Sequence, residues 1–294
     1  MKYLTPAAVA RIRSLRNRTS FKIGGTLEGR HETALKKGSS QEFSQYRQYA
    51  KGDETRFVDW KVYARKERLF IKEFSRQSAV KFNIIVDASG SMAFKGPGSA
   101  ESKWDYSARL ALYLACLFIT SGDYAGITAL SGDCLARFKP SNDLAALNEM
   151  DAGLAALRPS GASLPPEKLK GAAAAMGRNS SAVLLSDLMA EPERLKYLAG
   201  LFSSGRRKTF IFQPLDRAEL DLPWDGCAAF SDMETGDEVT MAPAAVREAY
   251  RLEFSGWLKH TAGAFSASGI KSFTAFTEAP PFVSLEKFIK LLQA

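Results

Sequence analysis

The sequence predicts an α/β protein, with a mostly parallel central sheet, helices on both faces and a basic N-terminal extension. Strand-like and helical stretches alternate with short links from residue 80 onward, which is typical of a parallel sheet covered by helices. Several of the strand-like stretches are continuous apolar runs, as expected for strands buried on both faces. The composition is 46% hydrophobic and 24% charged, which is that of a globular protein and excludes a largely disordered chain.

Positive charge is concentrated at the N-terminal end. The first 82 residues carry 19 Lys and Arg against 8 Asp and Glu, whereas the rest of the chain carries 21 against 24. We therefore divide the chain into a basic segment, 1–79, that packs on the sheet, and an α/β domain, 80–294. A basic surface of this kind can meet nucleic acid, an anionic membrane or an acidic protein, or it can simply keep the protein in solution.

The basic segment begins with a predicted helix and continues with a loop. Residues 6–18 carry apolar side chains at helical spacing directly after a Thr-Pro pair, which suits a cap and a first turn. Residues 19–45 are rich in Gly, Ser and Thr and show no period, so we expect a loop. Aromatic residues alternate with charges over 42–60, and 68–75 is predicted to be a strand.

The α/β domain is predicted from its periodicity. The strand at 80–86 ends in the apolar run NIIV, which is typical of a central strand. Further strands are expected at 124–130, 134–138, 182–186, 209–213 and 270–276. Helices are expected at 102–120, 142–157, 166–176, 191–203, 243–263 and 285–292. A Thr-Gly-Asp turn predicts a hairpin of 228–232 with 238–241.

Three loops at one predicted edge of the sheet carry oxygen-bearing side chains. The loop after NIIV reads Asp-Ala-Ser-Gly-Ser and supplies Asp87, Ser89 and Ser91. A second loop supplies Ser163, and Asp187 follows the apolar run AVLL. Ligands of open α/β sheets bind outside the carboxyl ends of the strands, so we expect these five side chains to converge.

Such a set of ligands favours a hard divalent cation. A small all-oxygen cage that retains water suits Mg²⁺, or Mn²⁺, better than Ca²⁺, and we expect the ion to be weakly bound. Two carboxylates balance its charge and leave it able to accept one carboxylate from outside. The alternative is purely structural, because an Asp after a buried strand often caps the following helix.

These residues resemble the metal-ion-dependent adhesion site of the von Willebrand factor A domain. That site uses a DxSxS motif, a Thr in a later loop and a further Asp. Asp87, Ser89, Ser91 and Asp187 match it residue for residue, and Ser163 stands where the family usually has Thr. The resemblance covers roughly residues 80–277 and implies a von Willebrand factor A-like fold.

The preceding segment resembles the bacterial family called domain of unknown function 58, or DUF58. The family pattern is G-x-x-x-EF, then R-x-Y, then GD-x-x-R-x-(I/V)DW, then AR. The matching residues are Gly38, Glu42, Phe43, Arg47, Tyr49, Gly52, Asp53, Arg56, Asp59, Trp60, Ala64 and Arg65. Members are commonly encoded beside MoxR-type AAA+ ATPases, so the resemblance implies an adaptor or co-chaperone of such a machine.

Part of this motif is expected to be structural. Asp53, Arg56, Asp59 and Arg65 can form a charge-paired network, with Trp60 as a large anchor. The simpler interpretation is that the network fastens the N-terminal segment to the sheet; the other is direct contact with a partner.

The leading functional hypothesis is a protein-interaction module that binds an acidic side chain of a protein partner through Mg²⁺ or Mn²⁺, with no small-molecule substrate. The first alternative is binding of nucleic acid or an anionic membrane by the basic surface. The second is a metal-dependent hydrolase that uses Asp87. We expect no enzyme, because Ser89 stands where a phosphotransferase would place its second Asp, and no histidine or P-loop accompanies these loops.

A cytoplasmic location is expected. Three widely spaced cysteines form no disulfide or zinc pattern, which suits a reducing compartment. The longest uninterrupted apolar run, 110–119, is too short to cross a bilayer, and the N-terminal residues contain no apolar signal core.

Overall fold

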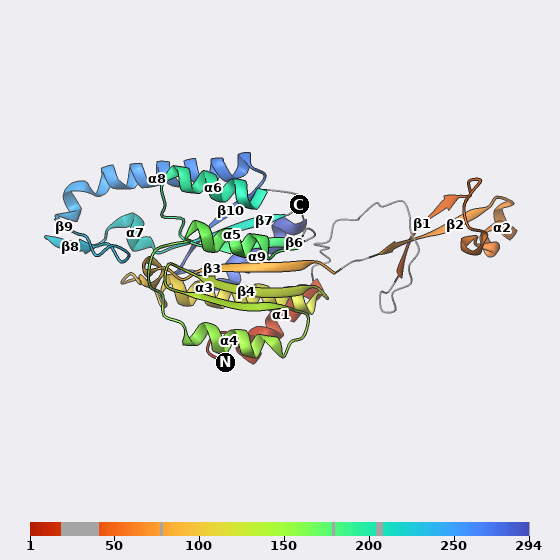
Figure 1. Cartoon of the computed structure of the whole chain (residues 1–294), viewed down its shortest axis with the longest axis horizontal. Helices are drawn as coiled ribbons and strands as arrows, with labels where there is room; N and C mark the ends of the chain where they lie inside the picture. Colours follow the sequence, from red (N-terminus) through yellow and green to blue (C-terminus); the bar gives the residue numbers. More distant parts are fainter. Residues whose placement is uncertain (19–40, 77–78, 178–179, 204–207, 294) are drawn as a thin grey trace. The chain divides into compact units, whose positions relative to one another are not determined.

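The computed structural model of the chain forms two compact units (Figure 1). One consists of Met1–Phe21 with Val80–Ala294, and the other is Lys22–Ala79. The structure describes residues 1–18, 41–76, 79–177, 180–203 and 208–293.

The larger unit is built on a six-stranded sheet in the order β10-β7-β6-β3-β4-β5. All neighbouring strands are parallel except β4 and β5, which are antiparallel. Strand β3 lies in the middle, with Ile84 opposite Ile127 of β4 and Val183 of β6. The strands are β3 (Lys81–Asp87), β4 (Tyr124–Leu130), β5 (Leu135–Ser141), β6 (Ser180–Leu185), β7 (Thr209–Leu215) and β10 (Lys271–Phe276).

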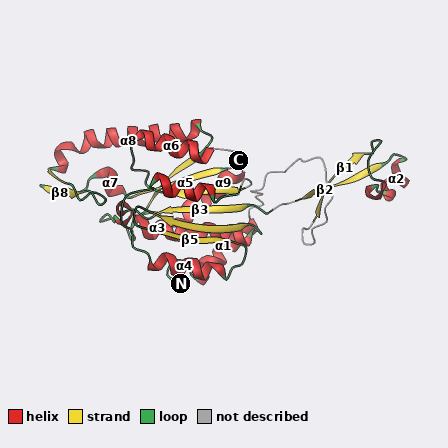
Figure 2. Cartoon of the chain, viewed as in Figure 1, coloured by secondary structure: helices red, strands yellow, loops and turns green. Residues whose placement is uncertain are grey.

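Helices cover both faces of this sheet (Figures 1 and 2). The helices are α1 (Pro6–Arg18), α3 (Lys103–Thr120), α4 (Ala146–Ala156), α5 (Pro166–Ala174), α6 (Pro192–Ser203), α7 (Arg217–Asp221), α8 (Pro243–Ala267) and α9 (Pro281–Gln293), with the short 3-10 turn η2 (Gly90–Ala93). Helices α1, α4 and α9 contact α3, whereas α5 and α8 contact α6. The predicted fold class, an α/β protein with a mostly parallel sheet between helices, is confirmed.

The two faces of the sheet have different cores. On the α3 face the rings of Phe82 and Phe118 stack at 3.7 Å, and Phe288 packs edge-on against Phe118. On the other face Ile85 and Leu184 belong to an aliphatic core shared with α5 and α6. Because side chains alternate along a strand, β3 can supply both cores, which explains why its sequence is apolar throughout.

The two units divide between Ala79 and Val80, where the sequence placed the boundary, but Met1–Phe21 belongs to the sheet unit and not to the smaller one. The backbone amides of Lys2 and Leu4 donate to the buried carboxylate of Asp151 in α4, at 2.7 and 2.8 Å. Tyr3 and Ile12 are fully buried. Sequence analysis grouped this helix with the basic segment because of its charge, but its apolar stripe packs against α3.

The smaller unit contains a hairpin and a short helix. Its strands β1 (Gln41–Gln48) and β2 (Phe70–Arg76) are antiparallel, and η1 (Thr55–Phe57) and α2 (Trp60–Lys66) lie between them in the chain. Strand β1 begins inside the predicted loop 19–45, so that prediction is wrong for 41–45; residues 19–40 lie outside the described part of the chain. The strand predicted at 68–75 is confirmed.

In the sheet unit, one hairpin agrees with its prediction and one helix was not predicted. The predicted hairpin is confirmed as β8 (Ala228–Ser231) and β9 (Glu238–Met241), which pair antiparallel. Helix α7 was not predicted; Asp216 and Glu219 close its first turn as a capping box.

No helix among the described residues is both long and apolar enough to cross a membrane.

Candidate metal centre

The predicted site residues follow the two strands at which the sheet changes direction. After β3 the chain adds β4 on one side, and later returns to place β6 on the other side of β3. Asp87 is the last residue of β3, and Asp187 lies two residues beyond β6. This is the position at which open α/β sheets bind ligands, and both carboxylates are fully buried there.

The structure brings all five predicted side chains together. Ser163 Oγ donates to Asp87 Oδ2 at 2.7 Å. Ser91 Oγ donates to Asp187 Oδ2 at 2.9 Å, and Ser89 Oγ lies 3.1 Å from Ser91 Oγ. One chain of hydrogen bonds thus links Ser89 and Ser91 to Asp187, and a second links Ser163 to Asp87. We call these five residues the oxygen site.

Backbone contacts hold the first two loops against each other. Ser160 N donates to Ala88 O at 2.9 Å, and Gly90 N donates to Gly161 O at 2.9 Å. A Cβ added at Gly90 would lie 2.2 Å from the carbonyl oxygen of Met233. Glycine is therefore required at this position, because the tip of the β8–β9 hairpin approaches the loop so closely.

The second and third loops carry left-handed residues directly after their functional side chains. Leu164 has φ of 38° and Leu188 has φ of 58°, a conformation that costs free energy for a branched residue and persists only where the surroundings enforce it. Arg194 donates to Leu164 O at 2.8 Å and also to Ser163 O. Gln213 Nε2 donates to Asp187 O at 2.8 Å. These contacts fix both loops.

Four further residues belong to the site and were missed from the sequence. Ser186 Oγ donates to Asp87 Oδ2 at 2.7 Å. Lys103, the first residue of α3, contacts Asp187 Oδ2 at 2.8 Å and Glu219 Oε1 at 2.5 Å. Glu234 Oε2, from the hairpin tip, accepts from Ser163 N at 2.9 Å.

Two of the four left a signal in the sequence: Ser186 directly precedes Asp187 in the predicted third loop, and Lys103 begins a helix. A positive charge in the first turn of a helix is unfavourable because it opposes the helix dipole. Lys103 is nevertheless the first residue of α3, an otherwise strongly apolar helix. Glu219 lies in α7 and Glu234 at the tip of the β8–β9 hairpin, both far from the other site residues in the chain.

The charge of Asp87 has no ionic partner among the described residues. Burial raises its pKa to about 6, and repulsion from Asp187 adds to the shift, while hydrogen bonds from Ser163, Ser186 and the Ser89 amide oppose it. For Lys103, burial lowers the pKa, but the charges of Asp187 and Glu219 outweigh it and the net shift is upward. The pKa of Glu219 is also raised, by burial, against the opposing effect of Lys103.

These residues fit a divalent cation in charge and in ligand type. Lys103 can neutralise only one of the two carboxylates that it contacts, and Asp87 keeps an uncompensated negative charge. The site offers carboxylate and hydroxyl oxygens, the ligands of Mg²⁺. Within the described residues, no three His, Cys, Asp or Glu side chains converge as a metal site by themselves, so any such site must use the serine hydroxyls.

The residues of the predicted charge network make local contacts in the smaller unit. Asp53 pairs with Arg47 at 2.8 Å, and Arg56 pairs with Glu54. Asp59 accepts the amides of the first turn of α2 and the hydroxyl of Tyr46 at 2.9 Å.

Arg65 forms no ion pair with any side chain that the structure describes. The side chain of Trp60 is exposed and contacts Tyr63 edge-on. Asp53 also accepts the amide of Ala50 at 2.8 Å, so each of the two aspartates is held by a neighbouring turn, and a single network of all four charged residues stays a prediction.

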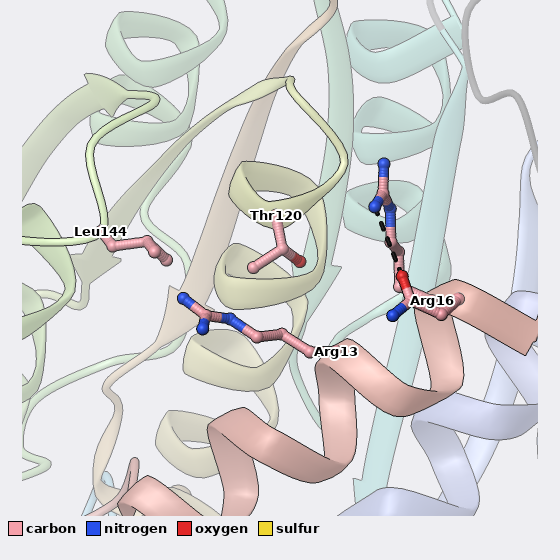
Figure 3. A pocket seen from close by; sticks show the side chains of 5 residues that line it. Arg13, Arg16, Thr120 and Leu144 are labelled. Carbon is pink, nitrogen blue, oxygen red and sulfur yellow. Dashed lines mark hydrogen bonds between the residues drawn. The ribbon is translucent and has the colours of Figure 1, made fainter.

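A separate hollow lies near the end of α3 (Figure 3). It is lined by Arg13, Arg16, Asn17, Thr120 and Leu144. Figure 3 shows the guanidinium groups of Arg13 and Arg16 extending from α1 beside Thr120, the last residue of α3. Because α3 runs back across the sheet from the carboxyl end of β3, this hollow lies at the opposite edge from the oxygen site.

Solved structures similar to this chain are remote in sequence. An aerotolerance-related membrane protein from Bacteroides fragilis, carrying multiple mutations to serine, has 15% identity and a TM-score of 0.45 over 72% of this chain and 100% of that chain. BatB, a conserved hypothetical protein from Bacteroides thetaiotaomicron, has 12% identity and a TM-score of 0.45 over 74% and 100%. The SpRpn10 VWA domain has 9% identity and a TM-score of 0.41 over 68% and 89%. The fold class rests on the strand order and the helix placement described above.

The family of the chain is shown by its sequence. No functionally curated protein matches it. The model of the family described as "Protein of unknown function DUF58" matches residues 45–256, which is most of the chain and includes all five residues of the oxygen site. The chain therefore belongs to the DUF58 family.

Proposed function

We propose that this protein is an interaction module that binds an acidic side chain of a protein partner through a divalent cation, Mg²⁺ or Mn²⁺, at the oxygen site. The observation that carries the proposal is the convergence of Asp87, Asp187 and three serine hydroxyls at the carboxyl edge of β3 and β6. Two carboxylates are fully buried there, and buried charge is costly unless it is compensated.

Charge balance supports the cation. Lys103 and Glu219 together carry no net charge, which leaves the charges of Asp87 and Asp187 to be neutralised. A divalent ion balances these two charges and, when bound, supplies a Lewis-acidic position for an outside carboxylate. Gly90, Leu164 and Leu188 fix the loop backbones around the site, so the oxygen atoms are positioned by the chain itself.

The rim of the site supports an acidic ligand. Glu234 already places a carboxylate at the amide of Ser163, so this rim accommodates a negative group. A partner carboxylate would approach the same rim. The hairpin that carries Glu234 has few buried side chains, so a partner can reach its tip from solvent.

Resemblance to the family supports a MoxR-type AAA+ ATPase as the partner and a role as its adaptor or co-chaperone. We propose binding without catalysis, no small-molecule substrate and a cytoplasmic location. Binding by this route predicts that a chelator releases the partner.

Calorimetric titration with Mn²⁺ tests the metal. The variant Asp87→Asn keeps the shape of the side chain and removes its charge, so we expect affinity to fall at least about tenfold. The matched control is Asp225→Asn, whose side chain is 97% exposed and which should bind as the parent protein does. Circular dichroism checks that both variants are folded.

The partner is tested with a purified MoxR-type ATPase from the same organism. We expect capture in Mg²⁺, loss of capture in EDTA, and loss of capture in Asp87→Asn. Unchanged Mn²⁺ affinity in folded Asp87→Asn would reject the metal, and capture that EDTA does not affect would reject binding through it.

A further inference from the structure

The ammonium group of Lys103 is buried inside the candidate metal centre. Its side chain is 1% exposed, and it contacts Asp187 Oδ2 at 2.8 Å and Glu219 Oε1 at 2.5 Å. A lysine is rarely this buried unless it is paired. Both carboxylates are held by other groups as well: Ser91 Oγ donates to the same oxygen of Asp187, and the amide of Asp216 donates to Glu219 Oε2 at 2.9 Å.

The contacts divide the site into two parts. Lys103 contacts Asp187 and Glu219. Asp87, by contrast, accepts only from the hydroxyls of Ser163 and Ser186 and the amide of Ser89 among the described residues. One part therefore contains its own cation, and the other contains a buried carboxylate without one.

We propose that Lys103 is a resident cation that lets the site fold without metal and keeps its affinity for divalent ions low. The inference rests on the proposed function and deepens it. The ammonium offsets one of the two negative charges of the Asp187 part at all times, so the metal is needed chiefly for the charge of Asp87. A positive charge close to the metal position also repels the ion, which makes metal binding reversible and exchangeable.

The proposal makes a double prediction for Lys103→Met, which removes the charge and keeps much of the volume. Asp187 and Glu219 then lose their cation. In EDTA the variant should therefore melt several degrees below the parent protein, because unpaired buried charges destabilise the fold. Mg²⁺ should restore most of that loss, and Mn²⁺ affinity should rise at least about tenfold.

Two controls separate charge from packing. Lys95→Met removes an exposed lysine from the neighbouring loop. It should change neither the melting temperature in EDTA nor the affinity for Mn²⁺. A merely structural role for Lys103 predicts equal destabilisation in EDTA and in Mg²⁺, and that result would overturn the proposal.

If Lys103→Met does not fold in either buffer, a second variant tests the role of Lys103. Glu219→Gln removes one negative charge and leaves the ammonium on Asp187, so Mn²⁺ affinity should fall several-fold below that of the parent protein. Unchanged or increased affinity in folded Glu219→Gln would overturn the resident-cation proposal.

The outcomes also separate this inference from the proposed function. If the parent protein binds no Mn²⁺ and Lys103→Met does, the lysine replaces the metal and the metal-dependent function is rejected. If both bind equally, the function stands and the role of Lys103 is rejected. If neither binds while both are folded, both proposals are rejected.

Discussion

Asp87 is the residue on which the chemistry of the site depends. It ends the central strand, it is fully buried, and burial together with Asp187 raises its pKa to about 6. A carboxyl group that titrates near neutrality and has oxygen neighbours is typical of functional sites. Its protonation state decides whether the Asp87 part of the site is negative or neutral.

Metal binding should therefore depend on pH through Asp87. The raised pKa means that folding favours the protonated form, so in metal-free protein this group contributes stability below the unfolded-state pKa of 3.8. That contribution, up to about 3 kcal/mol, is lost as the pH rises through about 6. A metal needs the deprotonated form, so Mn²⁺ affinity should fall about tenfold per pH unit below pH 6.

Titrations at about pH 5, 6 and 7 measure this dependence. Folded Asp87→Asn is the control, since its weaker residual binding should not follow the same curve. Affinity that stays constant from about pH 7 to about pH 5 would show that Asp87 does not bind the ion.

At the scale of elements, helix α2 shows how the family motif is used. Asp59 accepts the amides of Lys61 and Val62, as an N-cap should. Trp60 follows it and is 62% exposed. The acidic residue therefore stabilises the helix, and the tryptophan adds little to the packing of its own unit.

Two substitutions in α2 should differ in effect. Asp59→Ala should lower the opening free energy of α2 by about 1 kcal/mol, because the first turn loses its cap. Trp60→Ala should change it by about 0.5 kcal/mol or less, as exposed residues do. Hydrogen exchange of the α2 amides measures both. A larger loss in Trp60→Ala than in Asp59→Ala would restore Trp60 as the anchor predicted from the sequence.

At the scale of the whole molecule, the sheet unit includes the N-terminal helix. Ile12 is fully buried, and Asp151 of α4 accepts the amides of Lys2, Tyr3 and Leu4. A carboxylate that accepts several amides is strongly held. The first turn of the chain is therefore fastened to an element about 150 residues away.

Ile12→Ala should destabilise the whole sheet unit. The cavity and the lost burial should cost about 2–5 kcal/mol, measured as the free energy of unfolding in urea. The exposed neighbour Ser14→Ala is the control and should change it by less than about 0.5 kcal/mol. Equal effects of the two variants would mean that α1 is not part of the cooperative unit.

Much of the site could be predicted because its signals are local. Asp87 and Asp187 directly follow apolar strands, and parallel strands end at one edge of a sheet, so sequence position alone implied that they meet. The helical period of 6–18 likewise predicted α1. Charge misled the assignment of α1 to the smaller unit, because the helix carries four arginines beside the apolar stripe that packs on α3.

The sequence by itself determined the α/β class, the carboxyl edge on which the site lies and its five oxygen-bearing side chains, since periodicity and strand ends are properties of neighbouring residues. Only the tertiary structure decided that Lys103, Glu219 and Glu234 join that site and that Asp87 is left without an ionic partner among the described residues. Their meeting depends on how α3, α7 and the β8–β9 hairpin pack around the sheet, and packing between distant segments leaves no period in the sequence.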